Sequence, residues 1–100
     1  MQHIGMRRES ERGELLAEFE RDGVDVRVAE RAPASSVCLR YIDPYGDTVF
    51  NQLQVPVLIS ELEGLRAMVG EHDLRNNIDK VLAFLRASKE PHVYIRLLGD

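Results

Sequence analysis

Apolar residues recur along the chain with two different spacings, which separate strand-like segments from helix-like ones. Alternating positions suit a strand with one buried face, whereas spacings of three and four suit one face of a helix. The alternating segments are residues 14–20, 24–28, 37–42, 48–53 and 92–98, and the helical spacing covers 56–70 and 73–88. The pattern therefore predicts the element order β-β-β-β-α-α-β.

Residues 14–20 allow two interpretations. Apolar residues at alternating positions would share one strand face, but Leu15, Leu16 and Phe19 also lie on one side of a short helix. We favour the strand, because Arg21-Asp22-Gly23 follows it as a hairpin turn signal and clean alternation resumes afterwards.

The strongest turn signal is Asp43-Pro44-Tyr45-Gly46-Asp47, which lies between two apolar segments. Asp-Pro and Gly-Asp suit a tight turn, and the flanking β-branched and aromatic residues suit strands. We expect a hairpin here, with Gly46 at positive φ. The pattern Tyr-Ile-x-x-x-Gly-Asp occurs at residues 41–47 and again at 94–100, but it is too short to indicate an internal repeat.

Two helices are predicted between the fourth and fifth strands. Pro56 suits the first turn of one helix and Gly70 its end, while Asp73 suits the N-cap of the next and Pro91 follows its end. The apolar positions at helical spacing are Leu58, Leu62, Leu65 and Val69 in the first helix and Leu74, Ile78, Val81, Leu82 and Leu85 in the second. Glu61 is expected to face water.

These elements predict a single α+β domain over residues 13–100, preceded by a flexible N-terminal tail over residues 1–12. A five-stranded, mainly antiparallel sheet with two antiparallel helices on one face buries every apolar stripe, and places the last strand antiparallel to the fourth. The uncovered sheet face is expected to display Leu16, Arg27, Cys38, Arg40, Ile42, Tyr94 and Leu98. Such a face is too apolar for water and indicates a partner surface.

The charge balance narrows the range of partners. The 100 residues include 13 Lys and Arg against 17 Asp and Glu, which gives a net charge of −4 and argues against binding a phosphate backbone. No stretch reaches the roughly 20 apolar residues that cross a bilayer, and the first residues lack an apolar signal core. With one cysteine, Cys38, the chain has no internal disulfide. We expect a cytoplasmic protein that binds neither nucleic acid nor membrane.

Residues suited to catalysis are present, but their spacing matches no catalytic or metal-binding arrangement. The three histidines have no partner at zinc-ligand spacing, and Cys38 is expected to be a buried structural thiol. Asp43 and Asp47 are expected to bond the turn backbone. We therefore assign no catalytic residue, no metal site and no cofactor. The alternative is a pocket between sheet and helices in which Asp43, Asp47 and His92 bind or act on a small molecule.

The predicted hairpin and the start of the first helix carry side chains typical of binding surfaces. Tyr and Arg are enriched among the residues that dominate interface energies, and Asn and Gln offer paired donors and acceptors. The candidate binding residues are Arg40, Tyr41, Tyr45, Asn51, Gln52 and Gln54. The competing explanation is structural, with Tyr41 in the core and the amides hydrating an edge strand.

The leading hypothesis is a non-catalytic module that forms a homodimer and binds a protein partner. An adaptor role would fit, as would a role in which it neutralises or regulates that partner in the manner of a bacterial antitoxin or immunity protein. The hypothesis rests on the candidate binding residues and on the apolar content expected for the uncovered sheet face. The competing hypothesis is a small-molecule binder or small enzyme that uses the alternative pocket.

Overall fold

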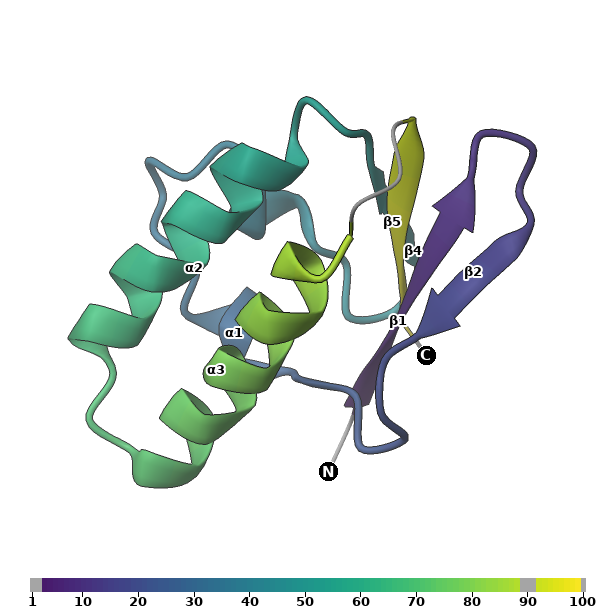
Figure 1. The fold of residues 1–100 in the computed structure, drawn as a ribbon. Coiled ribbons are helices and arrows are strands. Elements are labelled where there is room, and N and C mark those ends of the chain that lie inside the picture. The colour runs from purple at the N-terminus through teal and green to yellow at the C-terminus, as the bar shows by residue number, and fades with distance from the viewer. Residues whose placement is uncertain (1–2, 89–91, 100) are drawn as a thin grey trace.

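The computed structural model describes residues 3–88 and 92–99, and it shows an open sheet with two long helices on one face (Figure 1). The strands are β1 His3–Ser10, β2 Leu15–Glu18, β3 Val24–Asp25, β4 Asp47–Phe50 and β5 Val93–Leu98. The helices are α1 Arg27–Glu30, the 3-10 helix η1 Leu39–Tyr41, α2 Val55–Met68 and α3 His72–Arg86. The predicted α+β class, with an antiparallel sheet and two antiparallel helices, is confirmed. Pro91 and Asp100, which entered two of the predictions, lie outside the described residues.

The sheet has the strand order β2-β1-β5-β4, and β3 pairs with β1 beyond the end of β2. Every pairing is antiparallel, including β4 with β5, where Phe50 lies opposite Ile95. The predicted antiparallel pairing of the last strand with the strand before the helices is therefore confirmed. Residues 14–20 contain a strand, as we favoured over a helix.

The prediction of a flexible tail over residues 1–12 is wrong, because β1 is an inner strand of the sheet. Ile4 and Met6 are buried on its core face, at 0% and 2% exposure. Arg8 takes the next core-facing position, where its guanidinium lies 4.6 Å from the centre of the Phe84 ring and donates to the Phe84 carbonyl. A charged residue at a core position hid the alternation in this strand.

Both predicted hairpins are wrong in their pairing. β2 and β3 each pair with β1 and not with one another, and β3 ends at Asp25 before α1 begins. Residues 37–42 form η1 and its flanks in place of a strand. The apolar pattern predicted a strand here, and Cys38, Leu39 and Ile42 of this segment are indeed buried. A run of buried side chains makes a strand, however, only where a neighbouring strand is available to pair.

The helices bury the apolar positions that their spacing indicated. The buried helical residues are Leu58, Leu62, Leu65, Leu74, Ile78, Val81, Leu82 and Leu85. They pack against the inner face of the sheet, where Ile95 and Leu97 are 1% and 2% exposed. The predicted N-cap Asp73 lies in the first turn of α3, since that helix begins at His72.

Gly46 does not adopt the predicted positive φ, which among the described glycines belongs to Gly13 and Gly23. The close backbone approach at this point depends on Gly99, whose N–H donates to the Gly46 carbonyl at 2.8 Å. A Cβ on Gly99 would lie 2.5 Å from the Gly46 nitrogen. Gly46 and Gly99, which hold the same place in the two copies of the pattern, therefore meet, but Gly46 lies in a turn and Gly99 follows a strand, so they do not indicate a repeat.

Candidate functional site

The segment of residues 33–46 carries three of the candidate binding residues and runs without a strand between α1 and β4. Its backbone is held by Glu61 of α2, whose carboxylate accepts N–H groups from Val37, Cys38 and Leu39 at 2.6, 2.9 and 3.0 Å. Burial by itself raises the pKa of Glu61, but the three N–H donors outweigh it and hold the pKa below its usual range. The expectation that Glu61 faces water is therefore wrong.

Further side chains fix the rest of this segment. The Ser36 hydroxyl accepts the Arg40 N–H at 3.0 Å and donates to the Pro33 carbonyl at 2.7 Å. The Asp43 carboxylate accepts the Tyr45 N–H at 2.8 Å, while the Asp43 N–H donates to the Thr48 hydroxyl at 3.0 Å. Asp43 thus has the turn role that the sequence predicted.

Three buried side chains anchor the segment to the core. Leu39, Cys38 and Ile42 are 0%, 2% and 6% exposed. Burial raises the pKa of the Cys38 thiol, and the nearby Glu61 carboxylate raises it further. Because the thiolate is the reactive form, this cysteine has the structural character that we expected.

Four side chains of the segment face outward. Val37, Tyr41 and Tyr45 are 60%, 58% and 75% exposed, and Arg40 is exposed beside them. The Arg40 guanidinium lies 4.7 Å from the centre of the Tyr41 ring and donates to the Tyr41 hydroxyl at 2.6 Å. We call these four residues the loop surface. The alternative placement of Tyr41 in the core is wrong.

Asn51 and Gln54 lie outside the loop surface, in the turn that leads into α2. The Asn51 side-chain oxygen accepts the N–H groups of Leu53 and Gln54 at 2.9 and 3.0 Å. The Gln54 side-chain oxygen in turn accepts the Asn51 N–H at 2.8 Å. This reciprocal arrangement is that of a capping box, so both amides have a structural role.

Gln52 and His92 meet at the beginning of β5. The Gln52 side-chain oxygen accepts the His92 N–H, and His92 has a φ of 58°. Both residues line a hollow of about 200 Å³, together with Asn51 and Tyr94. The structure thus brings together two candidate binding residues and His92, away from the loop surface.

The alternative pocket of Asp43, Asp47 and His92 is not assembled. Asp47 lies opposite Leu98, at the end of β5, whereas His92 immediately precedes the start of that strand. A strand rises roughly 3.3 Å per residue, so the six residues of β5 separate the two carboxylates from the imidazole by roughly 20 Å. These three groups do not act on one small molecule.

The uncovered sheet face is more charged than the sequence predicted. Arg96 contacts Glu9 and Asp47 at 3.0 and 3.3 Å, and Arg7 lies 3.5 Å from Glu18. Of the residues expected on this face, Tyr94 and Leu98 share it through their register with β1. The residues that belong elsewhere are Cys38 and Ile42 in the core, Arg27 in α1 and Arg40 in η1.

An ion-pair cluster that the sequence did not predict joins α1 to α3. Arg27 donates to Asp25 and Asp73, both at 2.7 Å. Arg31 pairs with Glu71, and this hydrogen-bonded guanidinium lowers the pKa of Glu71 to about 2. Every charge in the cluster has an opposite partner, which indicates a structural connection between the two helices.

Within residues 3–88 and 92–99, no three His, Cys, Asp or Glu side chains are grouped as a metal site requires. No helix in the same part of the chain has the length and apolar character needed to cross a membrane.

Comparisons with protein-family models, with curated proteins and with solved structures found no match to this chain.

Proposed function

We propose that this protein is a small, non-catalytic cytoplasmic module that binds a protein partner through the loop surface. The observation that supports it is an outward group of Tyr, Arg and Val side chains on a segment whose backbone is already fixed by Glu61, Ser36 and Asp43. A preorganised surface loses less conformational entropy on binding than a mobile loop does.

The side chains of the loop surface suit a protein partner. Tyr41 and Tyr45 offer large, stiff aromatic groups with a polar tip, and such residues dominate many interface energies. Arg40 is already held by Tyr41 and by the Ala34 carbonyl at 3.2 Å, so its charge has a defined position. We expect the partner to offer an apolar recess for Tyr45 and a carboxylate near Arg40.

Self-association is a second part of the proposal. β2 and β4 are the outer strands of the sheet, and an outer strand presents backbone groups that can pair with another chain. β2 also exposes Leu15 and Leu16, at 55% and 43%. A second copy that pairs along β2 would cover both leucines. Sedimentation equilibrium should then give twice the mass of one chain, and a monomer at every concentration would contradict this.

The binding proposal is tested by comparing partner capture among three proteins. We would immobilise the wild type, the double variant Tyr41→Ala/Tyr45→Ala and the control Met68→Ala, whose residue is 74% exposed at the end of α2. Proteins captured from the source cells are quantified, and the candidate partner is then purified for titration. Two truncated aromatic anchors should weaken that partner's affinity at least tenfold, while the control should retain it.

Folding is measured in parallel, because a lost contact and a lost fold would look alike in a capture experiment. Tyr45→Ala should change the free energy of unfolding by less than about 0.5 kcal/mol, as expected for an exposed loop position. Equal capture by the double variant would refute the loop surface as the binding site. A large stability loss with unchanged capture would instead make Tyr45 a structural residue.

A further inference from the structure

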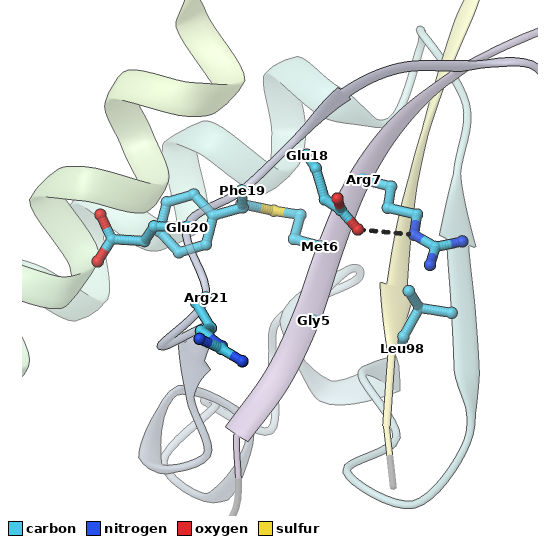
Figure 2. Close-up of a pocket in the computed structure, with 8 residues that line it drawn as sticks. All are labelled: Gly5, Met6, Arg7, Glu18, Phe19, Glu20, Arg21 and Leu98. Carbon is cyan, nitrogen blue, oxygen red and sulfur yellow. Dashed lines mark ion pairs between the residues drawn. The ribbon is translucent and has the colours of Figure 1, made fainter.

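A hollow of about 350 Å³ opens beside Gly5 of β1 (Figure 2). Along β1, the pairing with β3 ends at Ile4 and the pairing with β2 begins at Arg7. Between these two pairings, residues 20–23 form a turn in which the Gly23 N–H donates to the Glu20 carbonyl. Gly5 adds no side chain to this interval. We call the hollow the Gly5 pocket.

The walls of the Gly5 pocket combine apolar and cationic groups. In Figure 2, Arg21 lies on one side of the β1 ribbon, and Arg7 and Leu98 lie on the other, with Gly5 on the strand between them. Phe19, which is 9% exposed, adds a buried aromatic wall. A volume near the lower end of roughly 300–1,000 Å³ is typical of sites for small ligands.

The charges of the pocket leave one guanidinium in excess. Glu18 faces Arg7, with the nitrogen Nε and the oxygen Oε1 3.5 Å apart. Glu20 accepts a hydrogen bond from Lys80 of α3 at 3.2 Å, so an ammonium group outside the pocket offsets its charge. Arg21 is exposed, and within residues 3–88 and 92–99 its side chain has no ion pair or hydrogen bond.

We propose that the Gly5 pocket binds a carboxylate carried on a small aliphatic group. A guanidinium binds a carboxylate through two parallel N–H donors, and one unpaired guanidinium matches one negative charge. The aliphatic part would lie against Leu98 and Phe19. Two sources share this chemistry, namely a free organic acid and the last residue of a peptide chain. The site goes beyond the proposed function, since it shares no residue with the loop surface.

The probes that test the proposal are isocaproate, N-acetylleucine, N-acetylleucinamide and inorganic phosphate, each titrated while amide chemical shifts are recorded. Isocaproate and N-acetylleucine, the two carboxylates, should shift the amide signals of Gly5 and Leu98 until the shifts saturate. N-acetylleucinamide and phosphate should need at least tenfold higher concentrations to produce the same shifts. Tighter binding of isocaproate would support a free acid, and tighter binding of N-acetylleucine would support a peptide end. Equal binding of N-acetylleucinamide, preferred binding of phosphate, or no shift with any probe would overturn the proposal.

Substitutions then assign the binding to this pocket. A Cβ at Gly5 would meet the Leu98 Cβ at 3.5 Å, an ordinary contact, so Gly5→Val should fold while filling the hollow. It should weaken carboxylate binding at least tenfold with an unchanged melting temperature. Arg21→Gln should weaken it at least fivefold, and the control Arg12→Gln, an exposed position in the turn after β1, should not.

Unchanged affinity in both Gly5→Val and Arg21→Gln would place the ligand elsewhere and refute the site. If Gly5→Val fails to fold, Arg21→Gln against Arg12→Gln decides the question alone. Tyr41→Ala/Tyr45→Ala should leave carboxylate binding unchanged, so the pocket and the proposed function can fail independently.

Discussion

The helix pair α2–α3 and the irregular segment of residues 33–46 both bury apolar side chains, but their backbone N–H and C=O groups find hydrogen-bond partners in different ways. A helix closes its hydrogen bonds internally, so Leu62 and Leu82 need only a surface to pack against. The irregular segment buries Leu39 and Ile42 as well, yet its N–H groups bond to side chains such as Glu61. Local pattern therefore determines the helices, whereas partners distant in sequence determine the segment.

The largest effects should come from core truncations, and they test whether the two regions belong to one core. We expect Leu62→Ala, Leu82→Ala and Leu39→Ala each to lower the free energy of unfolding by roughly 2–5 kcal/mol, because each leaves a cavity. Urea denaturation measures this, with Leu53→Ala as the control at a residue that is 78% exposed. A loss under about 1 kcal/mol for Leu39→Ala alone would show that the irregular segment packs loosely.

The second largest effect should distinguish the irregular segment, which depends on a side-chain acceptor, from the helix pair, which does not. Glu61→Ala leaves three N–H groups of the irregular segment without their acceptor, so we expect a loss of about 2–3 kcal/mol. The matched control is Glu63→Ala, two residues along α2, whose exposed pairing with Arg86 should contribute about 0–1 kcal/mol. Equal losses for the two variants would contradict the anchoring role of Glu61.

The same carboxylate predicts a dependence on pH. The folded state lowers the pKa of Glu61, so its stabilisation is complete above the unfolded value of about 4.3 and is lost as the pH falls through the lower folded value. The difference in unfolding free energy between wild type and Glu61→Gln should therefore be constant from about pH 7 to 5 and narrow in more acidic solution. A difference that widens on acidification would contradict the lowered pKa.

The smallest effects should have opposite signs in the two regions. Gly64 lies within α2 with open space at its Cβ position, so Gly64→Ala should stabilise the protein by about 0.5–1 kcal/mol. A Cβ at Gly46 would lie 2.8 Å from an Asp43 carboxylate oxygen, so Gly46→Ala should destabilise it by about 1 kcal/mol. Thermal unfolding measures the change in stability for each variant. If both variants changed stability in the same direction, the expected contrast between the two regions would be contradicted.

The candidate site was predictable where residue type and local position were enough. Tyr45 lies in a turn, and its exposure follows from that place in the sequence. Asn51 and Gln54 are three residues apart before an apolar helix, which is the spacing of a capping box, so the sequence itself contained the signal for their structural role. The Gly5 pocket had no such signal, because it depends on where β2 and β3 pair along β1.

Periodicity and turn chemistry act over a few residues, so local sequence is enough to specify the two long helices, the strand after them and the turn around Asp43. Contacts between distant parts of the chain make residues 3–10 an inner strand and keep residues 37–42 from forming one. Arg8 can occupy a core position because Phe84 lies beneath its guanidinium, and Leu39 needs no strand partner because Glu61 accepts its N–H. Strand pairing and the hydrogen bonding of buried backbone groups depend on residues that are far apart in the sequence, so local pattern cannot predict them.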